Sequence, residues 1–186
     1  MTRALVPGSL GAVAERDGKS LAETFLSADA IVIVDTSGSM DEHDARGGRS
    51  RYGVACEELG RLQRDLPGKI AVVAFSSWVQ FEPSGVPAFM GGGTEMAEAL
   101  RFVKPADGCV RFILVSDGQP DNEAETLQVA RTFESKIDTI YIGPEDNRSG
   151  ADFLRRLAAA TGGRHVLAEK ADELAERVET LLLRAG

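Results

Sequence analysis

This 186-residue chain has only two cysteines, and no apolar run in it approaches the length of a membrane span. A membrane-spanning helix needs about 20 consecutive apolar residues, so we expect no membrane segment. Pro, Gly and charged residues interrupt the apolar side chains of residues 1–20, which therefore lack the apolar core of a secretory signal. Cys56 and Cys109 belong to no CxxC pair, so we expect two free thiols that are buried as small side chains. These absences favour a cytoplasmic chain; a portion of a secreted protein is the alternative.

Several catalytic motifs are also missing. The sequence has no G-x-S-x-G nucleophile turn, no G-x-x-x-x-G-K-[ST] phosphate loop and no G-x-G-x-x-G after an apolar run. It has two histidines, His43 in a charged loop and His165 at the start of the last apolar run, distant from the expected crevice, so neither is placed as the base that a nucleophile needs. We therefore exclude hydrolases with a catalytic triad, nucleotidases and dinucleotide-dependent enzymes, and we expect a protein that is not an enzyme.

The composition is that of one soluble globular domain, with 43% apolar and 27% charged residues. The formal net charge is −8. An acidic chain repels nucleic acid and anionic membrane surfaces and attracts cations or basic partners. An acidity that serves only solubility is an equally good interpretation of the charge alone. We expect no binding to nucleic acid or to membranes.

Short apolar runs rich in Val and Ile predict strands that are buried on both faces. The runs cover residues 30–34, 69–75, 110–115, 137–142 and, more weakly, 164–167. Residues 78–83 follow the second run after only two serines, and so tight a link predicts an antiparallel edge strand. Trp78 and Phe81 are expected to pack within that hairpin.

Segments with the apolar spacing of helices alternate with these strands. They cover residues 50–66, 94–103, 121–136, 149–163 and 171–183. The alternation predicts an α/β fold of Rossmann type, in which a doubly wound, mostly parallel six-stranded sheet carries helices on both faces. A capping box at Ser20 and Glu23 predicts a short leading helix. We therefore divide the chain into an N-terminal extension, residues 1–27, packed on a domain of residues 28–186.

Oxygen-bearing side chains follow the ends of the central strands. Asp35, Ser37 and Ser39 stand at alternate positions after the first strand, where they can turn toward one point. If the strands are ordered 3-2-1-4-5-6, the winding reverses between strands 1 and 4, and ligands of doubly wound sheets bind at that crevice. Asp117 ends strand 4 in the same crevice. Thr94 follows three glycines and offers another hydroxyl from the strand-3 side.

Two carboxylates and three hydroxyls form an all-oxygen set that suits Mg²⁺, with Ca²⁺ or Mn²⁺ as alternatives. Some of these side chains act through water, and at least one coordination position stays open. Residues adjacent to the five are expected to contact the ligand: Gly38, Met40, Gly93 and Gly118. Turn or helix-cap chemistry is the alternative interpretation of each serine, of Thr94 and of Asp117.

In order and spacing, Asp35-Thr-Ser-Gly-Ser39, Thr94 and Ser116-Asp117-Gly118 resemble the metal-ion-dependent adhesion site of von Willebrand factor type A (VWA) domains. The resemblance covers residues 28–183 and all five ligand positions. It implies a VWA domain in which the serines and the threonine bind the ion directly or through water, while the aspartates often act through water. The open position then takes a Glu or Asp carboxylate from a protein partner. The domain is expected as a monomer or as part of a larger complex.

The loop of residues 41–50 departs from the family pattern because it is longer and more charged. Asp41, Glu42 or Asp44 could screen the open position, or Arg46, Arg49 and Arg51 could engage an acidic partner. A solvated loop with neither role is the interpretation that we favour.

One enzyme remains as an alternative, a magnesium-dependent phosphatase that uses Asp35 as its nucleophile. Enzymes that resemble the haloacid dehalogenase family place a second acid two residues later, where this chain has Ser37.

Overall fold

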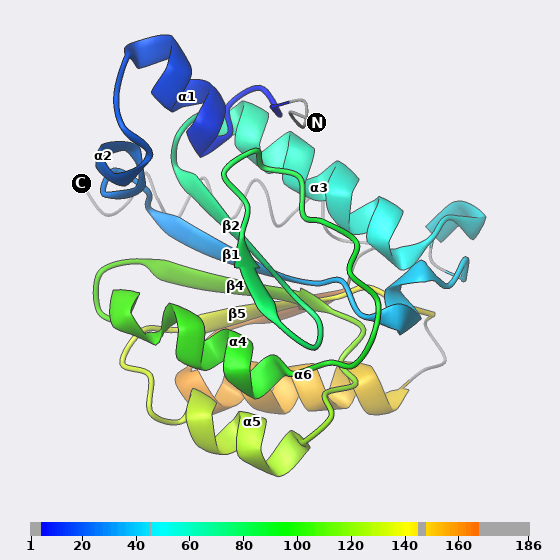
Figure 1. The fold of residues 1–186 in the computed structure, drawn as a ribbon. Coiled ribbons are helices and arrows are strands. Elements are labelled where there is room, and N and C mark those ends of the chain that lie inside the picture. The colour runs from blue at the N-terminus through cyan, green and yellow to red at the C-terminus, as the bar shows by residue number, and fades with distance from the viewer. Residues whose placement is uncertain (1–4, 45, 145–147, 168–186) are drawn as a thin grey trace.

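The computed structural model describes residues 5–44, 46–144 and 148–167, in which six strands form one sheet of order β3-β2-β1-β4-β5-β6 (Figure 1). The strands are β1 (Ala30–Asp35), β2 (Ile70–Phe75), β3 (Val79–Phe81), β4 (Arg111–Ser116), β5 (Ile137–Tyr141) and β6 (His165–Leu167). All neighbours pair in parallel except β3, which runs antiparallel to β2 at the edge. The predicted fold class and strand order are confirmed, and the winding reverses between β1 and β4.

Helices cover both faces of the sheet. The α-helices are α1 (Leu10–Asp17), α2 (Leu21–Phe25), α3 (Arg51–Asp65), α4 (Met96–Val103), α5 (Glu123–Ala130) and α6 (Arg148–Thr161). Short 3-10 turns are η1 (Gly38–Asp41), η2 (Arg46–Gly48) and η3 (Lys104–Ala106). Helices α4, α5 and α6 lie on one face and α3 on the other (Figure 1). The predicted helix at residues 171–183 lies outside the described residues.

Alternating side chains of the central strands explain why their sequences are almost wholly apolar. Ile31 and Ile33 of β1 belong to the core beneath α4 and α6, whereas Val32 and Val34 belong to the core beneath α3. All six residues of β1 are buried. A strand buried on both faces has no solvent side on which polar residues would be favoured, and Asp35 at its end therefore lies in a closed environment.

The N-terminal extension contains two helices, of which the sequence predicted one. The capping box of Ser20 and Glu23 is present at α2. Helix α1 was missed, yet Leu10 is 2% exposed and joins the main core. Backbone hydrogen bonds from Gly11 N to Pro83 O and from Gly68 N to Gly8 O tie the extension to the loops around it, both at 2.8–2.9 Å. Tertiary contacts thus hold α1 in place.

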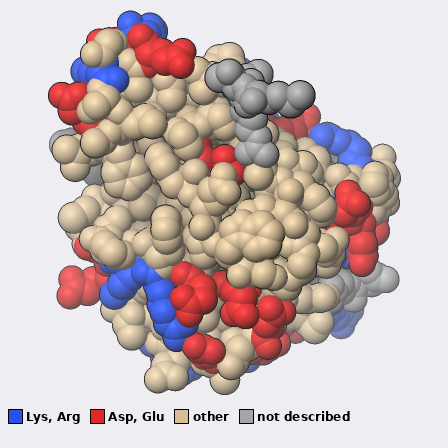
Figure 2. Space-filling model, in the orientation of Figure 1, with Lys and Arg blue, Asp and Glu red and all other residues tan. Residues whose placement is uncertain are grey.

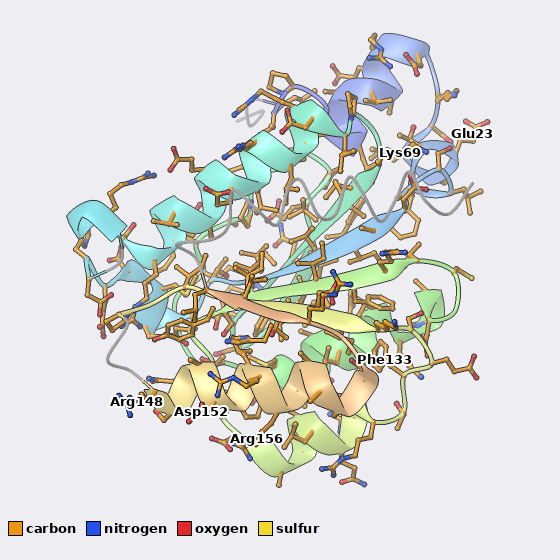
Figure 3. The ribbon with its side chains drawn as sticks, turned by 180° about the vertical axis from the view of Figure 1, so that it is seen from behind. Glu23, Lys69, Phe133, Arg148, Asp152 and Arg156 are labelled. Carbon is orange, nitrogen blue, oxygen red and sulfur yellow. The ribbon has the colours of Figure 1, made fainter. Side chains whose placement is uncertain are left out.

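Seen from behind, α6 carries Arg148, Asp152 and Arg156 along its outer surface (Figure 3). Arg156 reaches Glu123 of α5 at 2.5 Å, which links the two helices. At the other end of this layer Phe133 meets the ring of Phe112 edge-on, with centroids 5.2 Å apart. This helical layer thus has a packed aromatic pair on its inner side and charged residues on its exposed surface.

Both cysteines are free, with Cys56 half-buried and Cys109 exposed, so the prediction that they are buried was wrong. Among the residues that the structure describes, no helix combines the length and the hydropathy that crossing a bilayer requires.

Candidate metal centre

Backbone hydrogen bonds join the loop after β1 to the glycine loop before α4. Gly38 N donates to Gly92 O at 3.1 Å, and Gly91 N donates to Thr36 O at 2.9 Å. Gly91 has a φ of 66° and Gly92 a φ of 82°. Residues with a Cβ rarely adopt a positive φ, so the two glycines permit this close approach. These hydrogen bonds hold the two loops together, and Thr94 follows Gly92 by two residues in the second loop.

The loop after β4 is joined to the same turn by a side chain. Ser116 Oγ donates to Asp35 Oδ2 at 2.7 Å and accepts from Gly118 N at 2.9 Å. Asp35 Oδ1 accepts from Ser37 N at 2.9 Å. One oxygen of this fully buried carboxylate thus holds its own turn and the other binds the end of β4, the strand that the order 3-2-1-4-5-6 places beside β1.

The hydroxyls of Ser37 and Ser39 face each other, with their Oγ atoms 3.3 Å apart. Two adjacent ligands of an octahedral Mg²⁺ at 2.0–2.1 Å are separated by about 3 Å, so this spacing fits a shared ion. Ser37 is the N-cap residue of η1, but its side chain makes no capping hydrogen bond. The cap interpretation of Ser37 is therefore not supported.

Thr94 does not cap a helix either. Helix α4 begins at Met96 after the N-cap Glu95, two residues later than the sequence predicted. The backbone of Thr94 is instead bound to Asp121, which accepts from Thr94 N at 2.9 Å and donates its own N–H to Thr94 O at 3.1 Å. Asp121 thereby fixes the backbone position of Thr94. The cap of α5 is Asn122.

Asp117 is fully buried and is bound by a buried arginine. Arg51 Nη1 donates to Asp117 Oδ2 at 2.7 Å, and the Arg51 side chain is only 5% exposed. The other oxygen, Oδ1, accepts from Gln119 N at 3.3 Å, as the turn interpretation predicted. Asp117 therefore reaches the crevice already paired with a positive charge.

Arg51 also holds the charged loop against the site. Its Nε and Nη2 donate to the two oxygens of Asp44 at 2.8 and 2.6 Å, and Nη2 donates to Glu42 at 3.0 Å. Nη1 further donates to Ser39 O at 3.2 Å. Arg51 thus lies inside the protein, whereas residues 41–44 of the loop are exposed, in agreement with the predicted solvated loop. That this loop neither screens the ion nor engages a partner stays a prediction. Arg49 is bound to Glu57 and to Gly53 O.

The electrostatics of the crevice favour a cation. Burial raises the pKa of Asp35 to about 6, the charge of Asp117 acts in the same direction, and hydrogen bonds from Ser37 and Ser116 oppose the shift. A nearby cation stabilises the ionised form of such a carboxyl group. For Arg51, burial acts to lower the pKa, but hydrogen bonds and charges from Asp44, Asp117 and Glu42 outweigh it and raise the pKa. The guanidinium therefore stays charged.

The residues adjacent to the five candidate ligands have different positions. Gly38 forms part of the loop contact described above, and Gly93 N donates to Ser77 Oγ at 2.9 Å. Gly118 has a φ of 75°, and a Cβ built there would lie 2.1 Å from Gly150 O. Met40 is 0% exposed and belongs to the core beneath α3, so its prediction as a ligand contact is corrected.

Three contributing residues were not predicted as part of the site: Ser116, Asp121 and Arg51. The first two stand next to predicted elements, in "SDG" and at the start of "DNEAET", and loop convergence could have suggested them. Arg51 pairs with a residue 66 positions away, and no local pattern marks it.

Within the described residues, no three or more His, Cys, Asp or Glu side chains form a group that could hold a metal. This accords with the donor set proposed from the sequence, because it contains only two carboxylates and relies on hydroxyl oxygens. Such a set suits a hard cation that keeps several waters. The residues present fit a hydrated divalent ion, and its identity stays a prediction.

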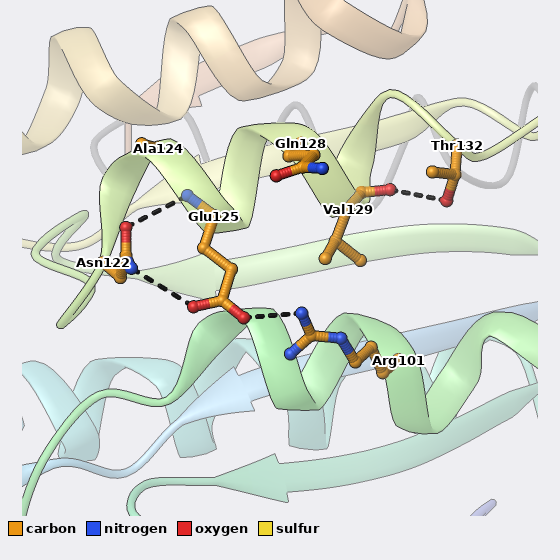
Figure 4. Close-up of a pocket in the computed structure, with 7 residues that line it drawn as sticks. All are labelled: Arg101, Asn122, Ala124, Glu125, Gln128, Val129 and Thr132. Carbon is orange, nitrogen blue, oxygen red and sulfur yellow. Dashed lines mark hydrogen bonds and ion pairs between the residues drawn. The ribbon is translucent and has the colours of Figure 1, made fainter.

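Two hollows lie elsewhere. One, of about 450 Å³, opens between α4 and α5, where Arg101 is bound to Glu125 at 2.6 Å and to Glu98 (Figure 4). Its one arginine is thus already neutralised. The other, of about 730 Å³, is apolar and lies between α2 and the end of α4, with Phe25, Leu26 and Phe102 among its lining residues. Neither hollow brings together groups suited to catalysis.

No family model and no curated protein matches this sequence. Solved structures do match its fold. An aerotolerance-related membrane protein from Bacteroides fragilis superposes with a TM-score of 0.64 at 11% identity, over 82% of this chain and 97% of that one. A von Willebrand factor type A structure from Catenulispora acidiphila gives 0.57 at 20% identity, over 82% and 42%. Manganese-loaded TRAP protein from Plasmodium vivax gives 0.51 at 16%, over 72% and 63%. The chain therefore has a VWA-like fold.

Proposed function

We propose that this chain is a divalent-metal-dependent protein-binding module. Mg²⁺ is held by Asp35, Ser37, Ser39, Thr94 and Asp117, directly or through water, and takes a Glu or Asp carboxylate from a protein partner. The hydrogen bonds that join the loops after β1 and β4 and the glycine loop before α4 support this proposal, because these three loops carry the five candidate oxygen donors and meet where the winding of the sheet reverses. A related fold loaded with manganese supports the class of ion.

Charge explains why the partner is acidic. The five donors include only two carboxylates, and Arg51 already neutralises part of Asp117, so a bound divalent ion keeps excess positive charge. A carboxylate from outside completes its coordination and balances that charge. Glu42 and Asp44 border the same region but are directed to Arg51. We further propose that the module works in the cytoplasm, alone or in a larger complex, and binds neither nucleic acid nor membranes.

Binding without catalysis is part of the proposal. A phosphatase would need Asp35 free to attack, but both of its oxygens accept hydrogen bonds and its side chain is fully buried. The position two residues later, where that enzyme class has its second acid, holds Ser37. The binding module is therefore the better proposal.

Calorimetric titration of magnesium chloride tests the ion. The wild type should bind one ion, and Asp35→Ala and Ser39→Ala should bind it at least about tenfold more weakly. Asp152→Ala, at an exposed site on α6, serves as the control and should match the wild type. Ser39 is only half-buried, so its variant should fold even if Asp35→Ala does not. Equal binding by all variants would overturn the metal assignment.

Co-purification in magnesium or in a chelator tests the partner. Proteins retained only in magnesium and lost with Ser39→Ala are expected. A retained set that is the same in chelator would contradict metal-bridged binding.

A further inference from the structure

The segment that borders the candidate metal centre on the β3 side is almost without charge. Residues 77–94 contain one ionisable side chain, Glu82, although 27% of the whole chain is charged. Glu82 is 4% exposed, and its Oε1 accepts from Ala88 N at 3.0 Å inside the segment. In Figure 2 the face over the β2–β3 hairpin and the loop after it is mostly uncharged, with Lys, Arg, Asp and Glu around its margin.

Two large aromatic side chains are exposed on this segment. Trp78 is 53% exposed and Phe89 is 42% exposed. The sequence predicted that Trp78 packs within the hairpin, and that prediction was wrong. Phe81 is packed, edge-on against Phe25 of α2 with centroids 5.8 Å apart. Tryptophan is enriched among the residues that dominate binding energy at protein interfaces.

Hydrogen bonds place both aromatics at the rim of the ion site. Trp78 follows Ser77, whose Oγ accepts from Gly93 N at 2.9 Å, directly before Thr94. Phe89 lies two residues before Gly91, whose N–H donates to Thr36 O in the turn that carries the candidate ligands. The two side chains thus stand on two segments, the turn between β2 and β3 and the loop after β3, and both segments are hydrogen-bonded close to Thr94.

Both positions are held before any partner arrives. Ser76 N donates to Trp78 O at 2.9 Å and closes the hairpin turn. Phe89 packs edge-on against Tyr52, with centroids 5.4 Å apart, and Tyr52 OH donates to Pro87 O at 2.7 Å. The backbone of Trp78 and the ring of Phe89 are thus already held, and a held group loses little conformational entropy on binding.

The loop that Arg51 holds beside the site has the contrary character. Glu42 and Asp44 are held there by Arg51, with side-chain exposures of 60% and 36%. An apolar part of a partner therefore fits Trp78 and Phe89, and a second acidic group is repelled by Glu42 and Asp44. This difference between an apolar and an acidic surface favours one orientation of the bound partner segment over the reverse.

We propose that Trp78 and Phe89 form an apolar contact surface that binds, and selects among, the residues next to the partner's acidic side chain. The occupant is a segment of another protein in which a Glu or Asp is flanked by an aromatic or large aliphatic residue. This inference rests on the proposed function, because the acidic side chain is the one that the ion takes.

An array of dodecapeptides tests the proposal. Each peptide carries a central Glu, with Trp, Phe, Leu, Ser or Gly at the flanking positions, and binding is measured by fluorescence polarisation in magnesium chloride. Peptides with aromatic or leucine flanks should bind about tenfold more tightly than those with serine or glycine flanks. Trp78→Ser and Phe89→Ser should reduce that preference to less than about threefold.

Phe102→Ser is the matched control, because Phe102 is 51% exposed but lies at the far end of α4 beside the apolar hollow. It should keep the wild-type preference. If a chelator leaves peptide binding unchanged, the proposed function fails. If a chelator abolishes binding but Trp78→Ser keeps the full preference, or if flanking residues have no effect, only the contact surface is refuted.

Discussion

Replacement of Arg51 by methionine should destabilise the fold in a way that depends on magnesium. Methionine keeps much of the apolar stem and removes the positive charge from a pair in which Arg51 is 5% and Asp117 0% exposed. Breaking a buried ion pair by removing one partner costs about 3–5 kcal/mol. The contacts to Glu42 and Asp44, which are 60% and 36% exposed, add about 1 kcal/mol or less each.

For a chain of this length the main loss corresponds to a fall in Tm on the order of 10 °C. Thermal unfolding followed by circular dichroism in chelator measures it. Arg49→Met is the control, because Arg49 and Glu57 are 48% and 56% exposed and their pair contributes about 0–1 kcal/mol.

Excess magnesium should narrow the gap between Arg51→Met and the wild type. The ion would supply positive charge to Asp117 in place of the guanidinium, so the variant gains more from the ion than the wild type does. A loss no larger than that of Arg49→Met would refute the energetic role of the buried pair. A large loss that magnesium leaves unchanged would refute the placement of Asp117 beside the ion.

Three further outcomes are expected. Asp107 accepts hydrogen bonds from Lys104 Nζ, Glu134 N and Ser135 N at 2.7–2.9 Å, which outweigh the effect of burial and hold its pKa below the ordinary value. A lowered folded pKa gives stability that is present above the unfolded pKa of about 4 and lost as pH falls. In urea titrations, Asp107→Asn should therefore cost about 2 kcal/mol at pH 7 and much less near pH 2; an equal cost at both would contradict the shift. Gly118→Ala should cost at least about 3 kcal/mol, because it adds a contact of 2.1 Å to the strain of a positive φ, whereas Gly162→Ala, with nothing within 4 Å, should cost about 1 kcal/mol. Equal losses of unfolding free energy in the two variants would show that the loop after β4 moves to accommodate the added Cβ. Hydrolysis of p-nitrophenyl phosphate by the wild type should be undetectable. Hydrolysis that is present in the wild type and lost in Asp35→Asn would favour the phosphatase over the binding module.

Buried strands and their order were predictable because their cause is local. Strands covered on both faces need continuous apolar runs, and the alternation of strand and helix restricts the topology to few choices. The closeness of the segments that carry Asp35 and Asp117 followed from that order, since the carboxyl ends of β1 and β4 meet at one crevice. Their role as metal ligands stays a prediction.

The features that were missed depend on contacts distant in sequence. Helix α1 lacks a strong helical pattern and is held by Pro83 and Gly68. The exposure of Trp78 depends on the glycine loop that meets its hairpin, and the burial of Arg51 depends on Asp117. Composition and apolar periodicity depend only on residues close together in the sequence, so they could not identify contacts between distant residues.

Helix α3 connects the crevice to the far side of the molecule as a rigid strut. At one end stands Arg51, and near the other the Gln63 carboxamide donates to Gly85 O at 2.9 Å. A Cβ built on Gly8 would meet Gln63 O at 1.9 Å, so the N-terminal segment rests directly on the same helical turn. The 15 residues of α3 span about 22 Å. A partner that pulls on the crevice would therefore exert a force along the axis of α3. Part of that force would be transmitted to the N-terminal segment, instead of acting only on the turn at Asp35.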